Sequence, residues 1–147
     1  MYRTVQPDLP APDSPWIYTV PGESFLRVLG IVVVLTPVVN VGDFTYIVNV
    51  DNGTDTLTIC QDVTGLVIES YTLMMGPKND RAGETFDLLF EHIVVRRHIP
   101  ILELPSGYRL NGFAYNVTAG LSIKTASVNI FADDLAYGAE RGPIGIY

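Results

Sequence analysis

The chain of 147 residues has the length of one domain and is long enough to bury a hydrophobic core. Apolar residues make up 48% of it, which excludes a chain that is disordered throughout. Acidic residues outnumber basic ones by 16 to 9, and only Arg96 and Arg97 are adjacent, so the sequence lacks the basic face that nucleic-acid binding needs. The single Cys60 excludes an intrachain disulfide, fits a reducing compartment and is expected to be a buried thiol.

The longest apolar-rich run, residues 28–41, is too short for a membrane helix, which needs about 20 apolar residues. The first residues also lack the apolar core of a secretory signal. We therefore expect no membrane partner, and we expect the chain to be made and folded in a cytoplasm.

Residues 1–15 contain four prolines, namely Pro7, Pro10, Pro12 and Pro15. Each proline fixes its own φ and lacks a backbone donor, so neither a helix nor a central strand is expected there. The composition predicts an extended N-terminal arm that is either disordered or laid against a partner.

Residues 16–20 form the first strand candidate, and residues 25–35 form the second. The second run is rich in β-branched residues and too apolar for a strand with one face in water. It predicts a central strand that is buried on both faces, or one whose outer face is covered by a neighbouring copy of the chain.

Residues 44–51 alternate between apolar and polar side chains, which predicts a strand with one buried face. Asn52-Gly53 follows, a strong hairpin signal, and predicts a turn into a returning strand over residues 56–61. Residues 66–75 are a further strand candidate.

Residues 86–97 carry two competing patterns. Several apolar residues fall at helical spacing, whereas the β-branched run at positions 93–95 favours a strand. We favour a strand for part of this stretch and leave a short helix open. Pro100 cannot donate to a ladder, so residues 99–104 predict a short edge piece.

Residues 104–131 predict a β-hairpin, in which a Pro-Ser-Gly turn opens one strand and Thr118-Ala119-Gly120 leads into the next. The eight or nine short strands, with almost no helix, predict an all-β fold: a jelly-roll-like antiparallel β-sandwich with extended N- and C-terminal arms. We assign the sandwich to residues 16–133, the N-terminal arm to residues 1–15 and the C-terminal arm to residues 134–147.

Three motifs lie near the two ends of the predicted sandwich: Val20-Pro21-Gly22-Glu23, Leu104-Pro105-Ser106-Gly107-Tyr108-Arg109-Leu110 and Asn116-Val117-Thr118-Ala119-Gly120. They resemble motifs of small virion proteins of tailed bacteriophages. The resemblance implies a jelly-roll-like capsid decoration or cement protein, or a small head or tail accessory protein. It spans about residues 20–131, and Leu121 departs from it, because these proteins often carry an acidic residue at that position.

Catalytic and metal-binding patterns are weak in this sequence. His92 and His98 are six residues apart, about 20 Å along a strand, and cannot share an ion unless the chain bends sharply. No Gly-x-Ser-x-Gly elbow, P-loop or dinucleotide-binding motif is present. We therefore expect no enzyme, no cofactor and no metal site.

Two other functions stay open at this point. A small hydrolase needs a pair of facing carboxylates, which folding could assemble from Glu69, Asp87, Glu91 and Glu103. A carbohydrate-binding module or adhesin tip needs exposed aromatic side chains, and the chain has one Trp and eight Tyr. Core or interface packing is the simpler role for these aromatics.

The function we expect is that of a viral structural protein in the virion, with the major capsid protein or other virion proteins as partners. The apolar run near Ile31 suggests a homo-oligomer, and the resemblance implies a trimer. The predicted interface has two parts. Aromatic and aliphatic tips fill pockets, so the anchors are Trp16, Ile144, Ile146 and Tyr147. The apolar run supplies the seam between copies, with Ile31, Val33 and Leu35.

Overall fold

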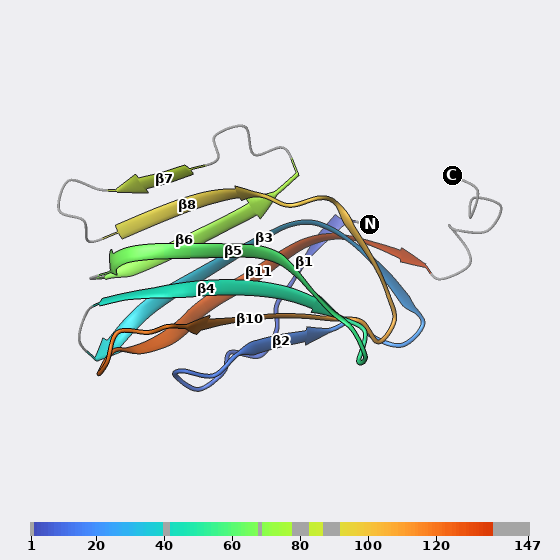
Figure 1. Ribbon diagram of the computed structural model, residues 1–147. Helices are drawn as coiled ribbons and strands as arrows, with labels where there is room; N and C mark the ends of the chain where they lie inside the picture. Colours follow the sequence, from blue (N-terminus) through green and yellow to red (C-terminus); the bar gives the residue numbers. More distant parts are fainter. Residues whose placement is uncertain (1, 40–41, 68, 78–82, 87–91, 137–147) are drawn as a thin grey trace.

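The computed structural model describes residues 2–39, 42–67, 69–77, 83–86 and 92–136, and in these ranges the chain forms two packed β-sheets and no helix (Figure 1). This confirms the predicted all-β sandwich. The strands are β1 (Tyr2–Val5), β2 (Trp16–Thr19), β3 (Ser24–Val39), β4 (Gly42–Asp51), β5 (Thr56–Val67), β6 (Ser70–Gly76), β7 (Gly83–Phe86), β8 (His92–His98), β9 (Leu102–Pro105), β10 (Arg109–Tyr115) and β11 (Ser122–Ala136).

The strand order is that of a jelly roll. The larger sheet runs β1-β11-β3-β6 and the smaller sheet runs β2-β10-β4-β5, so several successive strands cross from one sheet to the other. The larger sheet continues beyond β6 with β8, which is parallel to β6, and then with β7 (top of Figure 1). Strand β9 pairs with the start of β3. The described residues within 86–97 are all in strands, as the sequence favoured: Phe86 ends β7, and residues 92–97 belong to β8.

Two long strands form the spine of the larger sheet. Strands β3 and β11 pair antiparallel over nearly their whole length, with three shifts of register along the way. Such irregularities bend a long strand and increase its twist, which lets the sheet wrap around the core.

The Asn52-Gly53 turn forms as predicted. It joins β4 to β5, and the register ends at Asp51 opposite Thr56. The side chain of Asn52 accepts hydrogen bonds from the backbone N–H groups of Thr54 and Asp55 at 2.9 and 2.7 Å. Gly53 has a φ of 93°, a conformation that costs glycine little.

The predicted hairpin over residues 104–131 is wrong in one respect. Strands β10 and β11 are consecutive, but β10 lies in the smaller sheet and β11 in the larger one, so the two do not pair. The connection is a corner held to the start of β4, where the Thr118 backbone N–H donates to the Asp43 carbonyl at 3.0 Å. Turn residues reveal that the chain reverses, but not in which sheet the next strand pairs.

The N-terminal segment also differs from the predicted arm, which was to be either disordered or laid against a partner. Residues Tyr2–Val5 form β1, which pairs antiparallel with β11 at the edge of the larger sheet. Further along, the Asp13 carboxylate accepts hydrogen bonds from the Ile123 backbone N–H at 2.8 Å and from the Ser122 hydroxyl at 2.7 Å. The segment therefore lies on its own sandwich. The C-terminal arm lies outside the described residues from position 137 onward.

The core between the sheets is aromatic and aliphatic. The Trp16 indole N–H donates to the Tyr46 hydroxyl at 2.7 Å, and Gly112 makes room for both, since a Cβ there would lie 2.5 Å from Trp16 Nε1. Cys60 is buried as expected, and burial raises its pKa to about 11. None of the described elements is a helix capable of crossing a membrane.

Candidate docking surface

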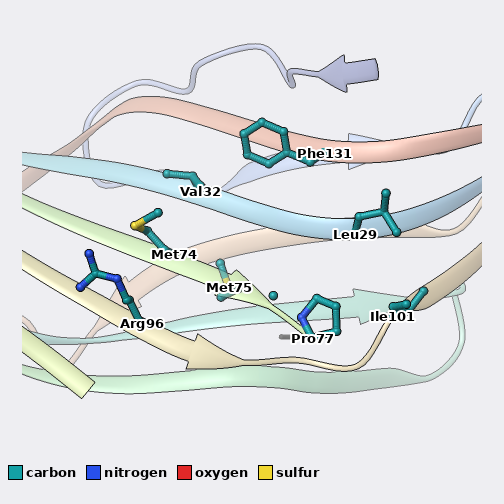
Figure 2. Close-up of a pocket in the computed structure, with 9 residues that line it drawn as sticks. Leu29, Val32, Met74, Met75, Pro77, Arg96, Ile101 and Phe131 are labelled. Carbon is teal, nitrogen blue, oxygen red and sulfur yellow. The ribbon is translucent and has the colours of Figure 1, made fainter. Parts of the chain in front are cut away.

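An apolar groove of about 570 Å³ lies on the outer face of the larger sheet (Figure 2). Strands β3, β6, β8 and β11 contribute to it, together with the chain that follows β6 and precedes β9. We call this surface the apolar groove. Its lining residues are Leu29, Val32, Met74, Met75, Gly76, Pro77, Arg96, Ile101 and Phe131.

The apolar groove exists because β3 is apolar on both faces. Its inward residues Ile31 and Val33 are fully buried in the core, while Val32 between them points outward and lines the groove. The sequence predicted either burial on both sides or cover by a neighbouring copy, and the described chain leaves this outer face partly open.

Two large side chains mark the groove. Phe131 on β11 is 44% exposed, and Ile101 before β9 is 49% exposed. Single exposed apolar residues are ordinary on protein surfaces, but a contiguous apolar surface is typical of a contact site. Arg96 is the one charged residue among the groove's lining residues.

Close backbone packing supports the floor of the groove. A Cβ at Gly30 would lie 3.0 Å from the carbonyl oxygen of Met75 on the paired strand β6. A larger residue at Gly30 would therefore push β3 and β6 apart under the groove.

The outer face of the smaller sheet mixes polar side chains with exposed apolar ones such as Ile17 and Val63. Asp51 accepts hydrogen bonds from Arg109, at 2.9 Å from Nε and 2.6 Å from the terminal nitrogen, and from Asn111 at 3.2 Å. The hydrogen bonds from Arg109 hold the Asp51 pKa below its usual range. These three polar side chains are therefore bonded to each other.

A second polar cluster lies between the sheets. The Tyr71 hydroxyl donates to Asp62 at 2.9 Å, and Arg97 on β8 bonds the same carboxylate. Asp62 and Tyr71 are buried, and burial raises the Tyr71 pKa strongly. The ion pair ties β5 of the smaller sheet to β8 of the larger one.

Ser70, His92 and Glu69 form a trio that the sequence analysis did not find. Ser70 Oγ lies 2.7 Å from His92 Nδ1, and Glu69 Oε2 lies 3.2 Å from His92 Nε2. The three groups follow the order of a catalytic triad, in which a nucleophile, a base and an orienting carboxylate are hydrogen-bonded in turn. The orienting carboxylate of such a triad is buried, whereas the Glu69 side chain is 54% exposed. The contact follows from the parallel pairing of β6 with β8, which a hydrophobic pattern does not reveal.

Of the other carboxylates considered for a hydrolase, the structure describes Glu103 alone. Glu103 pairs with Arg27 at 3.4 Å, while Asp87 and Glu91 lie outside the described residues. His92 and His98 occupy the two ends of β8. Within the described ranges, no group of three or more His, Cys, Asp or Glu side chains is placed to hold a metal ion.

Four of the predicted interface residues lie in the core, which corrects their assignment. Trp16, Ile31 and Val33 have no exposed surface, and Leu35 is 1% exposed, so none of them can meet a partner in the folded chain. The sequence showed that β3 was apolar on both faces but not which face was open. The remaining three, Ile144, Ile146 and Tyr147, lie outside the described residues.

Comparison with known proteins finds no relative of this chain. No protein-family profile, curated protein or solved structure matches the chain.

Proposed function

We propose that this protein is a non-enzymatic virion structural protein, of the capsid decoration or cement kind. It resides in the virion and attaches to the major capsid protein, or to another virion protein, through the apolar groove. The single observation that carries this proposal is the contiguous apolar surface beside Phe131 and Ile101, on a sandwich whose core is already complete without it.

Two further points support the proposal. The terminal motifs resemble those of phage virion proteins, and jelly rolls are frequent in viral capsids, which is support by analogy only. Covering the groove removes apolar surface from water, at about 25 cal/mol for each Å². Because many copies attach to one shell, a modest affinity for each copy suffices to hold the shell together.

The test is electron microscopy of particles from the virus that encodes this chain, made with and without it. We expect extra density on the outside of the shell only when the protein is present. Density confined to the neck or tail would instead assign it as a head–tail or tail accessory protein. Particles that contain no copy of the chain, by mass spectrometry, would contradict a virion role.

A second candidate function is carbohydrate binding by the smaller sheet. The rings of Phe113 and Tyr115 lie 6.2 Å apart on β10, and Gln61 donates to the Tyr115 hydroxyl at 3.0 Å. An aromatic pair beside fixed polar groups is a common platform for sugars. A glycan array tests this candidate: specific binding that is lost in Tyr115→Ala favours it, and a blank array with wild-type protein rejects it.

A further inference from the structure

The N-terminal segment over residues 2–13 follows the edge of β11 that is not paired with β3, and we call it the N-terminal strap. Its register starts with Tyr2 opposite Asp133 and reaches Val5 opposite Ile130. Gln6 then donates to Asn129 at 2.6 Å, and the Asp13 backbone N–H donates to the Ile123 carbonyl at 2.8 Å. The strap therefore runs antiparallel along β11 from one end to the other.

Few side chains hold the strap in place. Of its twelve residues, only Val5 and Pro7 are buried. The attachment depends mainly on hydrogen bonds at the strap's two ends, and elements held in this way open at low cost relative to global unfolding. The sandwich core lies largely outside the strap, so releasing the strap leaves most of the core packed.

The end of the strap nearest β2 is strained. Asp13 has a φ of 67°, a left-handed conformation that non-glycine residues adopt at some cost, although Asp tolerates it better than most. Opening the turn at Asp13 relieves this strain, and a strained hinge favours the exchange of an element between copies.

The prolines of the N-terminal strap keep it extended after release, which favours its binding to another sheet edge. Pro7, Pro10 and Pro12 keep a released strap extended, so that its twelve residues reach roughly 35 Å and lose little entropy on binding again. The uncovered edge of β11 offers the same hydrogen bonds to an identical strap from another copy.

From these observations we infer that the N-terminal strap exchanges between copies: it leaves its own β11 and pairs in the same antiparallel register with β11 of a second copy. The exchange links neighbouring copies by a strand. It does not depend on attachment to a shell, because both partners are this chain. The alternative is a strap that only protects the edge of its own sheet.

Disulfide trapping with mixed chains tests the exchange. One full-length chain carries Thr4→Cys and the other Phe131→Cys, both with Cys60→Ala, because positions 4 and 131 face each other in the β1–β11 register. Opposite residues of antiparallel strands lie within disulfide range. We expect a mixed covalent dimer on oxidation, with a yield that rises with protein concentration. A chain with both cysteines that closes its own disulfide, while no mixed dimer forms, would overturn the proposal.

A hinge variant gives a readout that needs no disulfide. Asp13→Ala and Asp13→Gly both remove the carboxylate and keep the backbone N–H, but only glycine adopts a φ of 67° without strain, so the glycine variant is the matched control. By analytical ultracentrifugation, we expect Asp13→Ala to self-associate at a concentration at least tenfold lower than Asp13→Gly. Equal association of the two folded variants would also overturn the exchange.

Discussion

The outer faces of the two sheets differ although both sheets cover the same core. The face of the larger sheet presents the contiguous apolar groove, and the face of the smaller sheet presents the bonded polar cluster of Asp51, Arg109 and Asn111 together with exposed apolar residues such as Ile17 and Val63. Folding alone requires only the inward faces to be apolar. The contiguous apolar lining of the groove is therefore not needed for folding, and it is the reason we propose a partner for the larger sheet.

The largest expected effect is on the free energy of unfolding, and it compares a carboxylate buried between the sheets with one on the outer face of the smaller sheet. We expect Asp62→Asn to cost about 3 kcal/mol of unfolding free energy, because it removes the charge that partners Arg97 and Tyr71 between the sheets. Asp51→Asn, on the outer face of the smaller sheet, is expected to cost less than about 1 kcal/mol. Urea unfolding of both variants measures the difference, and equal losses would contradict the placement of Asp62.

Neighbouring valines on β3 test the two faces of the larger sheet directly. Val33 has no exposed surface, whereas Val32 lines the apolar groove. We expect Val33→Ala to lower the unfolding free energy by about 2 kcal/mol and Val32→Ala by less than about 1 kcal/mol. If Val32→Ala were the more damaging change in urea unfolding, the inward and outward faces would have to be exchanged.

A smaller effect concerns acid stability of the polar cluster of Asp51, Arg109 and Asn111. The Asp51 pKa is lowered in the folded chain, so the contact with Arg109 stabilises the fold above the ordinary carboxyl pKa. This contribution is lost as the pH falls from that ordinary value through the lowered one. Between pH 5 and pH 2, melting temperatures of wild type and Asp51→Asn should therefore converge. A gap that widens toward low pH would mean that the sign is wrong.

Much of the fold could be predicted from local patterns. The alternation in residues 44–51 and the Asn52-Gly53 turn depend on side-chain period and turn chemistry alone, and both appear in the structure as expected. The strand β1 was missed because four prolines near it argued for an arm, although Tyr2–Val5 itself contains none.

The candidate site was harder to predict. A strand such as β3, apolar on both faces, gives no sign of which face meets the other sheet, so Val33 and Val32 could not be told apart from the sequence. Trp16 resembled an exposed anchor because the space for its ring comes from Gly112, which is distant in sequence and adjacent only through the pairing of β2 with β10. Long-range strand pairings of this kind determine which side chains are buried and which line the candidate site.

The most direct test of the central claim compares one exposed apolar residue from each sheet. Phe131→Ser removes the ring from the apolar groove, and Val63→Ser changes a residue of the smaller sheet that is 70% exposed. Each purified variant, with an unchanged melting temperature, is co-sedimented with virus particles that lack the protein. The account predicts that Val63→Ser binds like wild type and that Phe131→Ser binds at least tenfold more weakly. Full binding by Phe131→Ser, or loss of binding by Val63→Ser alone, would contradict it.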